Sequence, residues 1–279
     1  MPTPRQRKDE WLSMIEVNRF DEVMQINMSR LLEGKPRYWV AAYLVDGLLV
    51  DTGCNHTRNE LVELLTSESV RWAVNTHYHE DHIGANDLLK KSLGIEIFAH
   101  RDSVPLINKV PKLHPYQELV WGYPDPTEVS CLSERIETDH FHFDVVETPG
   151  HCNGHVALVE PNKGWCFSGD LFVRENPRVI RPEENIPELI RSMEVLLGIR
   201  TERLVLFTSG GGVVQDGRKA LRSCIGYLED LSQRAKQLQQ EGATTSAIVD
   251  QLFGGESSLA QFTGGAFSSK NLILSILRA

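Results

Sequence analysis

The fold is decided by residues 70–82, VRWAVNTHYHEDH. The apolar residues of 70–75 predict a strand that leads directly into a cluster of histidines and acidic residues. Side chains two positions apart in an extended segment share a face, so His77 and His79 can reach one ion together. Asp81 and His82 follow after a turn and can face a second position. Neutral imidazoles with a carboxylate suit zinc, iron or manganese, and the competing interpretation is a polar loop without a metal.

Composition and charge limit the class of protein. The chain has 279 residues, of which 41% are hydrophobic and 24% charged, as is usual for a soluble globular protein of one large domain or one domain plus an appendage. Its net charge of -9 disfavours broad attraction to nucleic acid or an anionic membrane. We therefore expect a small-molecule substrate, no nucleic-acid or membrane partner, and a possible homodimer.

The expected compartment is the cytoplasm. Residues Met1 to Glu10 are polar and charged and lack the apolar stretch of a secretory signal. No apolar run approaches the ~20 residues that span a bilayer. The five cysteines contain no CxxC pair, which disfavours a disulfide framework and fits a reducing environment.

Periodicity predicts alternating strands and helices followed by helices alone. The predicted strands are 38–45, 48–50, 70–75, 95–98, 143–147, 155–160, 165–168 and 203–207, and the predicted helices are 59–66, 88–93, 185–197, 221–238, 244–253 and 268–277. This pattern divides the chain into an N-terminal segment (1–19), an α/β domain (20–215) and a helical C-terminal extension (216–279). Residues 100–137 hold five prolines and predict either a loop that covers substrate or a plain surface connection.

Further ligand-type residues follow three predicted strands. Asp51 follows 48–50, His151 follows 143–147, and Asp170 follows 165–168. Side chains at strand ends converge when the strands end at one edge of a sheet, where sites are commonly built. We therefore expect these residues to gather near residues 77–82.

The gathered residues can serve two metal positions. Three histidines with an open position for water form a catalytic metal pattern, and the candidates are His77, His79 and His151. Asp81 and His82 can serve a second position, with the two carboxylate oxygens of Asp170 between the ions. A hydroxide held there is nucleophilic at neutral pH, because a bound metal lowers the pKa of water toward ~7.

The ordered set His77-x-His79-x-Asp81-His82, His151 and Asp170 resembles the metallo-β-lactamase superfamily over about residues 20–215. The resemblance implies a four-layer αββα sandwich of two mixed β-sheets with flanking helices. It implies that His77, His79 and His151 hold one metal ion, that Asp81 and His82 hold another, and that Asp170 lies between them. The helical C-terminal extension is similar to the glyoxalase II-like and thioesterase-like subset.

The turn after the last predicted strand departs from the family pattern. The family usually places a histidine there, whereas this chain has Gly210 within Thr208-Ser209-Gly210-Gly211-Gly212. A glycine offers no side chain to a metal, so the second ion can be weak, exchangeable or absent. His56 is the nearest substitute in sequence, and its alternative interpretation is a surface-loop histidine. We expect one or two divalent ions, zinc foremost, with iron or manganese as alternatives.

The resemblance also suggests roles for residues that are not expected to be the main metal ligands. Asp51 resembles a residue that orients a metal ligand from behind, with a simple turn aspartate as the alternative. His155 resembles a structural histidine that does not bind metal. Cys152 is either a small buried residue or a thiol near the metals, and Asp81 is the candidate to hold or shuttle a proton.

Three functions stay open at this stage. The first is a hydrolase of a small ester, thioester or lactone, in which a metal-bound hydroxide attacks the carbonyl carbon. The second is a mononuclear non-haem iron sulfur oxygenase, similar to persulfide dioxygenases, that uses His77, His151 and Asp170. The third is a metal-containing relative that binds a ligand without turnover.

Overall fold

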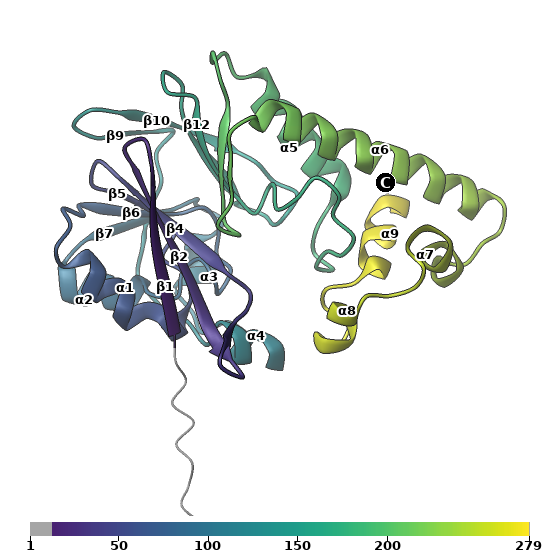
Figure 1. Cartoon of the computed structure of the whole chain (residues 1–279), viewed down its shortest axis with the longest axis horizontal. Coiled ribbons are helices and arrows are strands. Elements are labelled where there is room, and N and C mark those ends of the chain that lie inside the picture. The colour runs from purple at the N-terminus through teal and green to yellow at the C-terminus, as the bar shows by residue number, and fades with distance from the viewer. Residues whose placement is uncertain (1–12, 279) are drawn as a thin grey trace, which may run out of the picture.

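Two β-sheets pack face to face, and helices cover the outer side of each sheet (Figure 1). The computed structural model describes residues 13–278. The first sheet has the order β1-β2-β4-β5-β6-β7-β8, with β3 paired to β2, and the second has the order β14-β13-β12-β11-β10-β9. Both sheets mix parallel and antiparallel pairs. The predicted four-layer sandwich with a helical C-terminal extension is therefore confirmed.

The strands have the following bounds. The first sheet contains β1 (Ser13–Phe20), β2 (Val23–Leu32), β3 (Lys35–Pro36), β4 (Val40–Val45), β5 (Leu48–Val50), β6 (Trp72–Asn75), β7 (Glu96–Ala99) and β8 (Ser130–Cys131). The second sheet contains β9 (Arg135–Glu137), β10 (His142–Glu147), β11 (Val156–Glu160), β12 (Trp165–Gly169), β13 (Val205–Thr208) and β14 (Val213–Val214).

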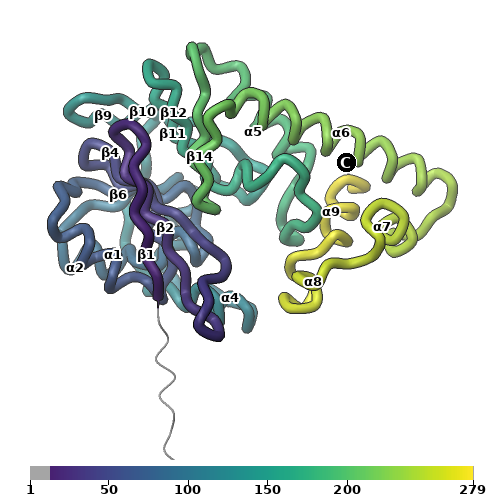
Figure 2. Tube along the Cα trace, in the orientation of Figure 1, coloured from purple at the N-terminus to yellow at the C-terminus, as the bar shows by residue number. Residues whose placement is uncertain are grey.

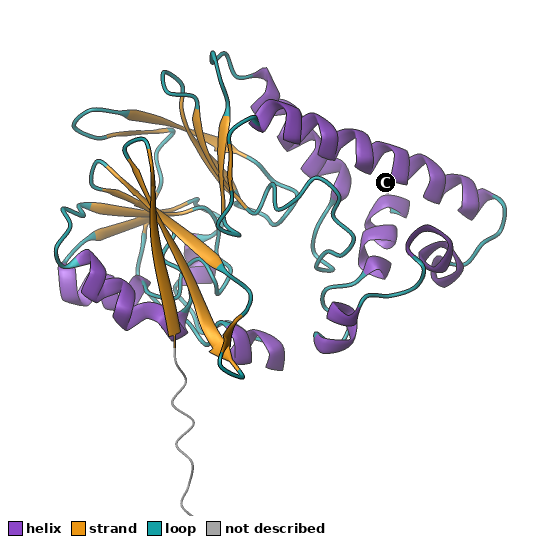
Figure 3. Cartoon of the chain, in the orientation of Figure 1, coloured by secondary structure: helices purple, strands orange, loops and turns teal. Residues whose placement is uncertain are grey.

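The helices form the outer layers and the extension. They are the 3₁₀ turn η1 (Asn55–Thr57), α1 (Arg58–Leu65), α2 (Asn86–Leu93), α3 (Val104–Ile107), α4 (Pro115–Val120), α5 (Ile186–Gly198), α6 (Gly217–Gln240), α7 (Thr245–Phe253), α8 (Ser258–Phe262) and α9 (Ser269–Leu277). Figure 3 shows the two groups of strands with the helices outside them. Within the described residues, no helix is both long and apolar enough to cross a bilayer.

Three hydrophobic clusters correspond to the interfaces between layers. The central cluster lies between the sheets and includes Tyr43, Phe143, Trp165 and Phe207. A second cluster packs α1 and α2 on the first sheet, and a third packs α5, α6, α7 and α9 on the second. β4 is buried at every position, because it has helices on one face and the other sheet on its second face. The C-terminal helices therefore extend the outer layer of the second sheet (Figure 2).

Local sequence signals explain where several elements end. Asp46 and Gly47 have φ values of 47° and 82°, as the two-residue turn between β4 and β5 requires. The Asn185 side chain accepts a hydrogen bond from the Glu188 backbone N–H at 3.1 Å and caps α5. Gly94 ends α2 in the left-handed conformation with φ 67°.

The structure differs from the sequence expectations at the N-terminal hairpin of β1 and β2. These strands pair over residues 13–30, so the first sheet begins within the segment 1–19 that the sequence set apart. β1 is a half-exposed edge strand and lacks the strict alternation of a core strand. Residues 1–12, and with them the expectation for Met1 to Glu10, lie outside the described residues.

Residues 100–137 contain two short helices and two short strands, α3, α4, β8 and β9. Pro115 begins α4, and His114 and Gln117 form a reciprocal capping box around it. Tyr116 and Trp121 are buried in the hydrophobic cluster that packs α1 and α2 on the first sheet. The segment is therefore anchored to the core by its aromatic side chains.

Candidate metal centre

The loop after β6 carries the histidine cluster and is held by the loop after β5. The Thr52 backbone N–H donates to the His82 carbonyl at 2.9 Å, and the Gly84 N–H donates to the Gly53 carbonyl at 2.8 Å. A Cβ atom at Gly84 would lie 2.3 Å from the Cys54 backbone. This close approach requires glycine, and it places the ligand-bearing loop directly against Asp51.

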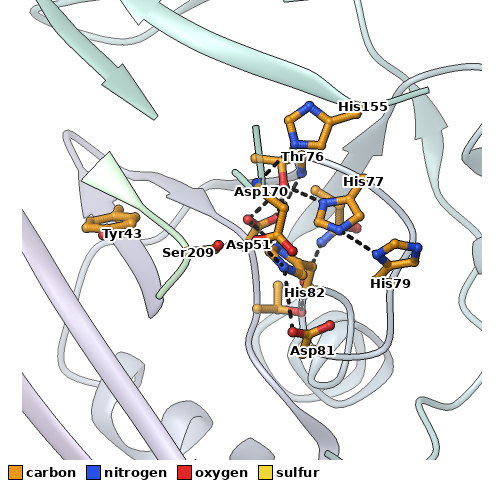
Figure 4. Close-up of polar contacts among 12 residues, drawn as sticks. Tyr43, Asp51, Thr76, His77, His79, Asp81, His82, His155, Asp170 and Ser209 are labelled. Carbon is orange, nitrogen blue, oxygen red and sulfur yellow. Dashed lines mark hydrogen bonds and ion pairs between the residues drawn. The ribbon is translucent and has the colours of Figure 1, made fainter. Parts of the chain in front are cut away.

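The imidazole rings of His77 and His79 lie side by side (Figure 4), and His151 joins them, as the sequence predicts. The His79 Nδ1 atom lies 3.0 Å from His77 Nε2 and 2.9 Å from His151 Nε2. Asp170 Oδ2 lies 3.3 Å from His151 Nε2. The four ligand atoms all lie within 4.8 Å of one another, and they come from loops of both sheets. A divalent cation would satisfy all four at once, because each can offer it a lone pair.

The hydrogen bonds of the His77 ring show which of its two nitrogen atoms faces the metal cluster. Thr76 Oγ1 donates to Asp51 Oδ2 at 2.9 Å, so it accepts from His77 Nδ1 at 3.0 Å. The His77 Nε2 lone pair therefore points into the site. Burial first, and then the neighbouring histidines, lower the pKa of His77 well below its ordinary value. Burial and then Arg181 do the same to the pKa of His79. Both rings are thus neutral, the form that binds metal.

Two histidines, His82 and His151, each have a carboxylate on the side of the ring that faces away from the metal cluster. Asp51 Oδ2 accepts from His82 Nδ1 at 2.8 Å, and its other oxygen accepts from the Thr76 N–H at 2.8 Å. Glu184 Oε2 lies 3.3 Å from His151 Nδ1. Contacts of this kind fix the ring orientation and raise ligand basicity. The structure thus places Asp51 behind His82, and it adds Glu184, which sequence reasoning missed.

His155 lies next to Asp170 and faces away from the metal cluster. Its Nε2 atom accepts a hydrogen bond from the Asp170 backbone N–H at 3.1 Å, so its Nδ1–H donates to Thr148 Oγ1 at 2.8 Å. Burial lowers the pKa of His155 to about 3. Gly169 has φ 49°, and a Cβ there would lie 2.6 Å from His155 Nε2. A neutral histidine and a glycine therefore set the position of Asp170.

The second position gathers Asp81, His82 and Asp170. His82 Nε2 lies 3.5 Å from Asp170 Oδ1 and 3.9 Å from Asp81 Oδ2. Among the described residues, His82 Nε2 and Asp81 Oδ1 are buried and have no hydrogen-bond partner. Burial is the main cause that raises the pKa of Asp81 to about 6. Unpartnered buried polar atoms are costly, and a cation between these groups would satisfy them.

The turn after β13 offers only a hydroxyl group to this position. Ser209 Oγ donates to Asp170 Oδ1, whereas Gly210 has no side chain, and a Cβ there would meet no atom within 4 Å. His56 does not substitute, because η1 directs it toward Arg30 Nη1 at 2.8 Å and the Glu118 carbonyl at 3.0 Å. The second position therefore has three strong ligand side chains, and the first has four.

A buried ion pair beside the second position was not predicted. Arg181 Nη2 lies 3.2 Å from Glu80 Oε1 and 3.9 Å from Asp81 Oδ1. Although burial opposes its charge, Glu80 and Asp81 raise the pKa of Arg181. Its guanidinium lies 5.8 Å from the Trp121 ring centroid and 5.1 Å from that of Phe267. Arg181 thus joins the metal loop, the 100–137 segment and the C-terminal extension.

Cys152, next to His151, is buried, and burial is the main cause that raises the pKa of its thiol. A cavity of about 530 Å³ reaches His151 and Asp170 from the side of the C-terminal helices. The connection between β12 and α5, helix α6 and the connection between α7 and α8 all contribute to its wall. The metal cluster is therefore accessible to a small molecule.

The chain is similar in sequence to several known proteins. A family model described as the Metallo-beta-lactamase superfamily matches residues 40–225. A hydroxyacylglutathione hydrolase of Haemophilus influenzae is 27% identical over 152 residues, which cover 52% of this chain and 70% of that protein. One from Legionella pneumophila is 30% identical over 105 residues, 37% of this chain and only 34% of that protein.

Solved structures show the same fold. A metallo-beta-lactamase family protein from Thermus thermophilus superposes with a TM-score of 0.65 at 18% identity and covers 93% of this chain and 94% of its own. The protein TTHA1623, solved in a di-iron-bound form, has a TM-score of 0.53 at 26% identity and covers 67% of this chain and 94% of its own.

Proposed function

The chain belongs to the metallo-β-lactamase superfamily, and on this premise we propose that it is a metal-dependent hydrolase of a small ester, thioester or lactone. The observation that carries the proposal is the convergence of His77, His79, His151 and Asp170 within 4.8 Å at the end of a cavity. The relatives named hydroxyacylglutathione hydrolases support a hydrolase that acts on an acylated thiol.

The metal is proposed to be zinc, held by these four side chains. Three histidines and a carboxylate suit zinc, and neutral imidazoles are its common ligands. Such a cation, when bound, supplies Lewis-acid polarisation of a carbonyl group and lowers the pKa of water. Glu184 would keep the His151 ring in its ligand orientation, and the His155 imidazole would hold the Asp170 backbone. We assign Asp81, whose Oδ1 has no hydrogen-bond partner among the described residues, to hold or move a proton.

The test combines metal analysis with hydrolysis. Protein purified without added metal is analysed by mass spectrometry for metal content and assayed with p-nitrophenyl acetate and S-acylglutathiones. We expect His77→Ala to lose metal and hydrolysis together, and His140→Ala to keep both. His140 is the matched control because its exposed ring contacts Asp46, outside the cluster.

Two results would overturn the proposal. One is metal-loaded protein that hydrolyses no ester, thioester or lactone of a broad panel. The other is a single bound iron with oxygen uptake on a persulfide, which would establish the sulfur oxygenase.

A further inference from the structure

The cavity beside the metal cluster is continuous with the candidate site. His151 and Asp170 form part of its wall, and its volume of about 530 Å³ lies within the range of ~300–1,000 Å³ that small-molecule sites span. A substrate whose reacting carbonyl lies at the metal cluster can therefore place its adjoining group in this cavity. The cavity is therefore a candidate place for part of the substrate.

The inner wall of the cavity is apolar. Val173, Val179, Phe253 and Leu259 line it, and all four are exposed or partly exposed, so they present apolar surface to an occupant. They come from the connection between β12 and α5, from α7 and from α8. An apolar group gains roughly 0.8 kcal/mol for each CH₂ that it buries, which corresponds to about fourfold in affinity. The wall therefore favours an apolar acyl group over a polar one.

The acidic residues of the cavity wall are already engaged. Glu184 lies against His151 and accepts from the Arg181 backbone N–H at 2.7 Å. Glu256 accepts from the backbone N–H groups of Ser269 and Lys270 at 2.9 Å and 2.7 Å. These carboxylates serve the fold, so they do not define a cationic substrate.

The basic residues lie where the wall is exposed. Arg178 donates to the Phe253 carbonyl and packs over that ring at 5.4 Å. Arg174 is exposed and makes no hydrogen bond or ion pair within residues 13–278. A guanidinium offers up to five donors in a planar arrangement that suits carboxylate and phosphate oxygens. The exposed rim can thus bind an anionic group.

We propose that this cavity holds the apolar acyl group of the substrate and that Arg174 binds an anionic group on its leaving portion. The inference rests on the proposed hydrolase and specifies its substrate class as an anionic ester or thioester of an apolar acid. In the reaction, one water adds its oxygen to the carbonyl carbon, and the bond from that carbon to sulfur or oxygen breaks. The products are the carboxylate, the protonated thiol or alcohol, and one proton that is released to solvent.

The acyl part is tested with p-nitrophenyl acetate, butyrate and octanoate. We expect kcat/KM to rise with chain length, by up to about fourfold per methylene. Val173→Trp should remove this rise while hydrolysis of the acetate persists, because the indole would narrow the exposed wall of the cavity. Val195→Trp is the matched control, since Val173 and Val195 are 53% and 52% exposed and Val195 lies on α5 outside the cavity wall.

The anionic part is tested with octanoyl-coenzyme A against neutral p-nitrophenyl octanoate. Arg174→Gln should raise KM about tenfold for the coenzyme A thioester, with kcat unchanged, and leave the neutral ester unaffected, because one charge-assisted contact contributes about a factor of ten. Arg222→Gln, an exposed substitution on α6 outside the cavity wall, should change neither substrate.

The outcomes separate this inference from the proposed hydrolase. Hydrolysis with no dependence on chain length, and with Val173→Trp equal to wild type, overturns the acyl pocket and leaves the hydrolase standing. Equal KM values for Arg174→Gln and wild type on the thioester overturn the anion site. Binding of octanoate to the wild type, measured by calorimetry and weakened in Val173→Trp, supports the pocket independently of turnover. Metal-loaded protein without any hydrolysis overturns the proposed function itself.

Discussion

Arg181→Met is expected to lower the free energy of unfolding by about 3–5 kcal/mol, because it leaves the Glu80 carboxylate buried without its cation. The paired side chains are only 6% and 3% exposed, and their closest atoms lie 3.2 Å apart. Gln117 Nε2 would remain as a donor to Glu80 at 2.7 Å, but an amide does not neutralise the charge. Methionine is apolar and similar in length, so it can fill the space beside Trp121 and Phe267, and the loss then reports the ion pair together with the cation–π contacts to these rings.

The assay is urea denaturation of metal-free protein at neutral pH, so that metal affinity does not enter the comparison. Glu80→Gln in the Arg181→Met background should restore most of the loss, since the carboxylate that lost its closest cation is then replaced by a neutral amide. The control is Arg203→Met, whose exposed pair with Asp21 should contribute about 0–1 kcal/mol. A loss below ~1 kcal/mol for Arg181→Met, or a double variant whose loss equals the sum of the two single losses, would refute the reasoning.

Three further predictions concern separate parts of the molecule. Glu184→Gln should weaken metal affinity about 10–100-fold, because it removes the carboxylate behind His151, as measured by competition with a chromogenic chelator; unchanged affinity would contradict this role. Thiol labelling of the native protein should modify only Cys131, the exposed one of five cysteines, and mass spectrometry of tryptic peptides would reveal any second site. Gly226→Ala in α6, where a Cβ meets nothing within 4 Å, should raise stability by about 0.5–1 kcal/mol, whereas Gly84→Ala should lower it; calorimetric melting that ranks the two in the opposite order would be inconsistent with the packing.

The sequence predicted the parts of the site that follow strand ends. His77, His79, His151 and Asp170 each come shortly after a strand with a clear apolar pattern, and the loops that follow strands commonly carry sites. Strand positions and the family resemblance together predicted the convergence that the structure shows, although the ligands come from two sheets and not from one sheet edge.

The residues that sequence reasoning missed depend on tertiary contacts. Glu80 lies inside the histidine motif and looks like a solvated charge until Arg181 pairs with it from about a hundred residues away. β2 was missed because it buries polar side chains: Gln25 donates to the Gly211 carbonyl and Ser29 donates to the Arg37 carbonyl. Neither periodicity nor composition reveals such pairings, because the partner is brought close only by the fold.

The proposed metal ligands come from both halves of the sandwich, and this has a thermodynamic consequence for a protein that binds the ion. His77 and His79 follow β6 of the first sheet, whereas His151 and Asp170 follow β10 and β12 of the second. Neither sheet alone carries the full ligand set, so a cation binds the assembled protein far more tightly than either half or the unfolded chain. Free metal at a hundred times its dissociation constant would then add about 2.7 kcal/mol to the stability of the whole domain. Cellular metal supply would in this way set how much of the protein survives proteolysis as well as how much is active.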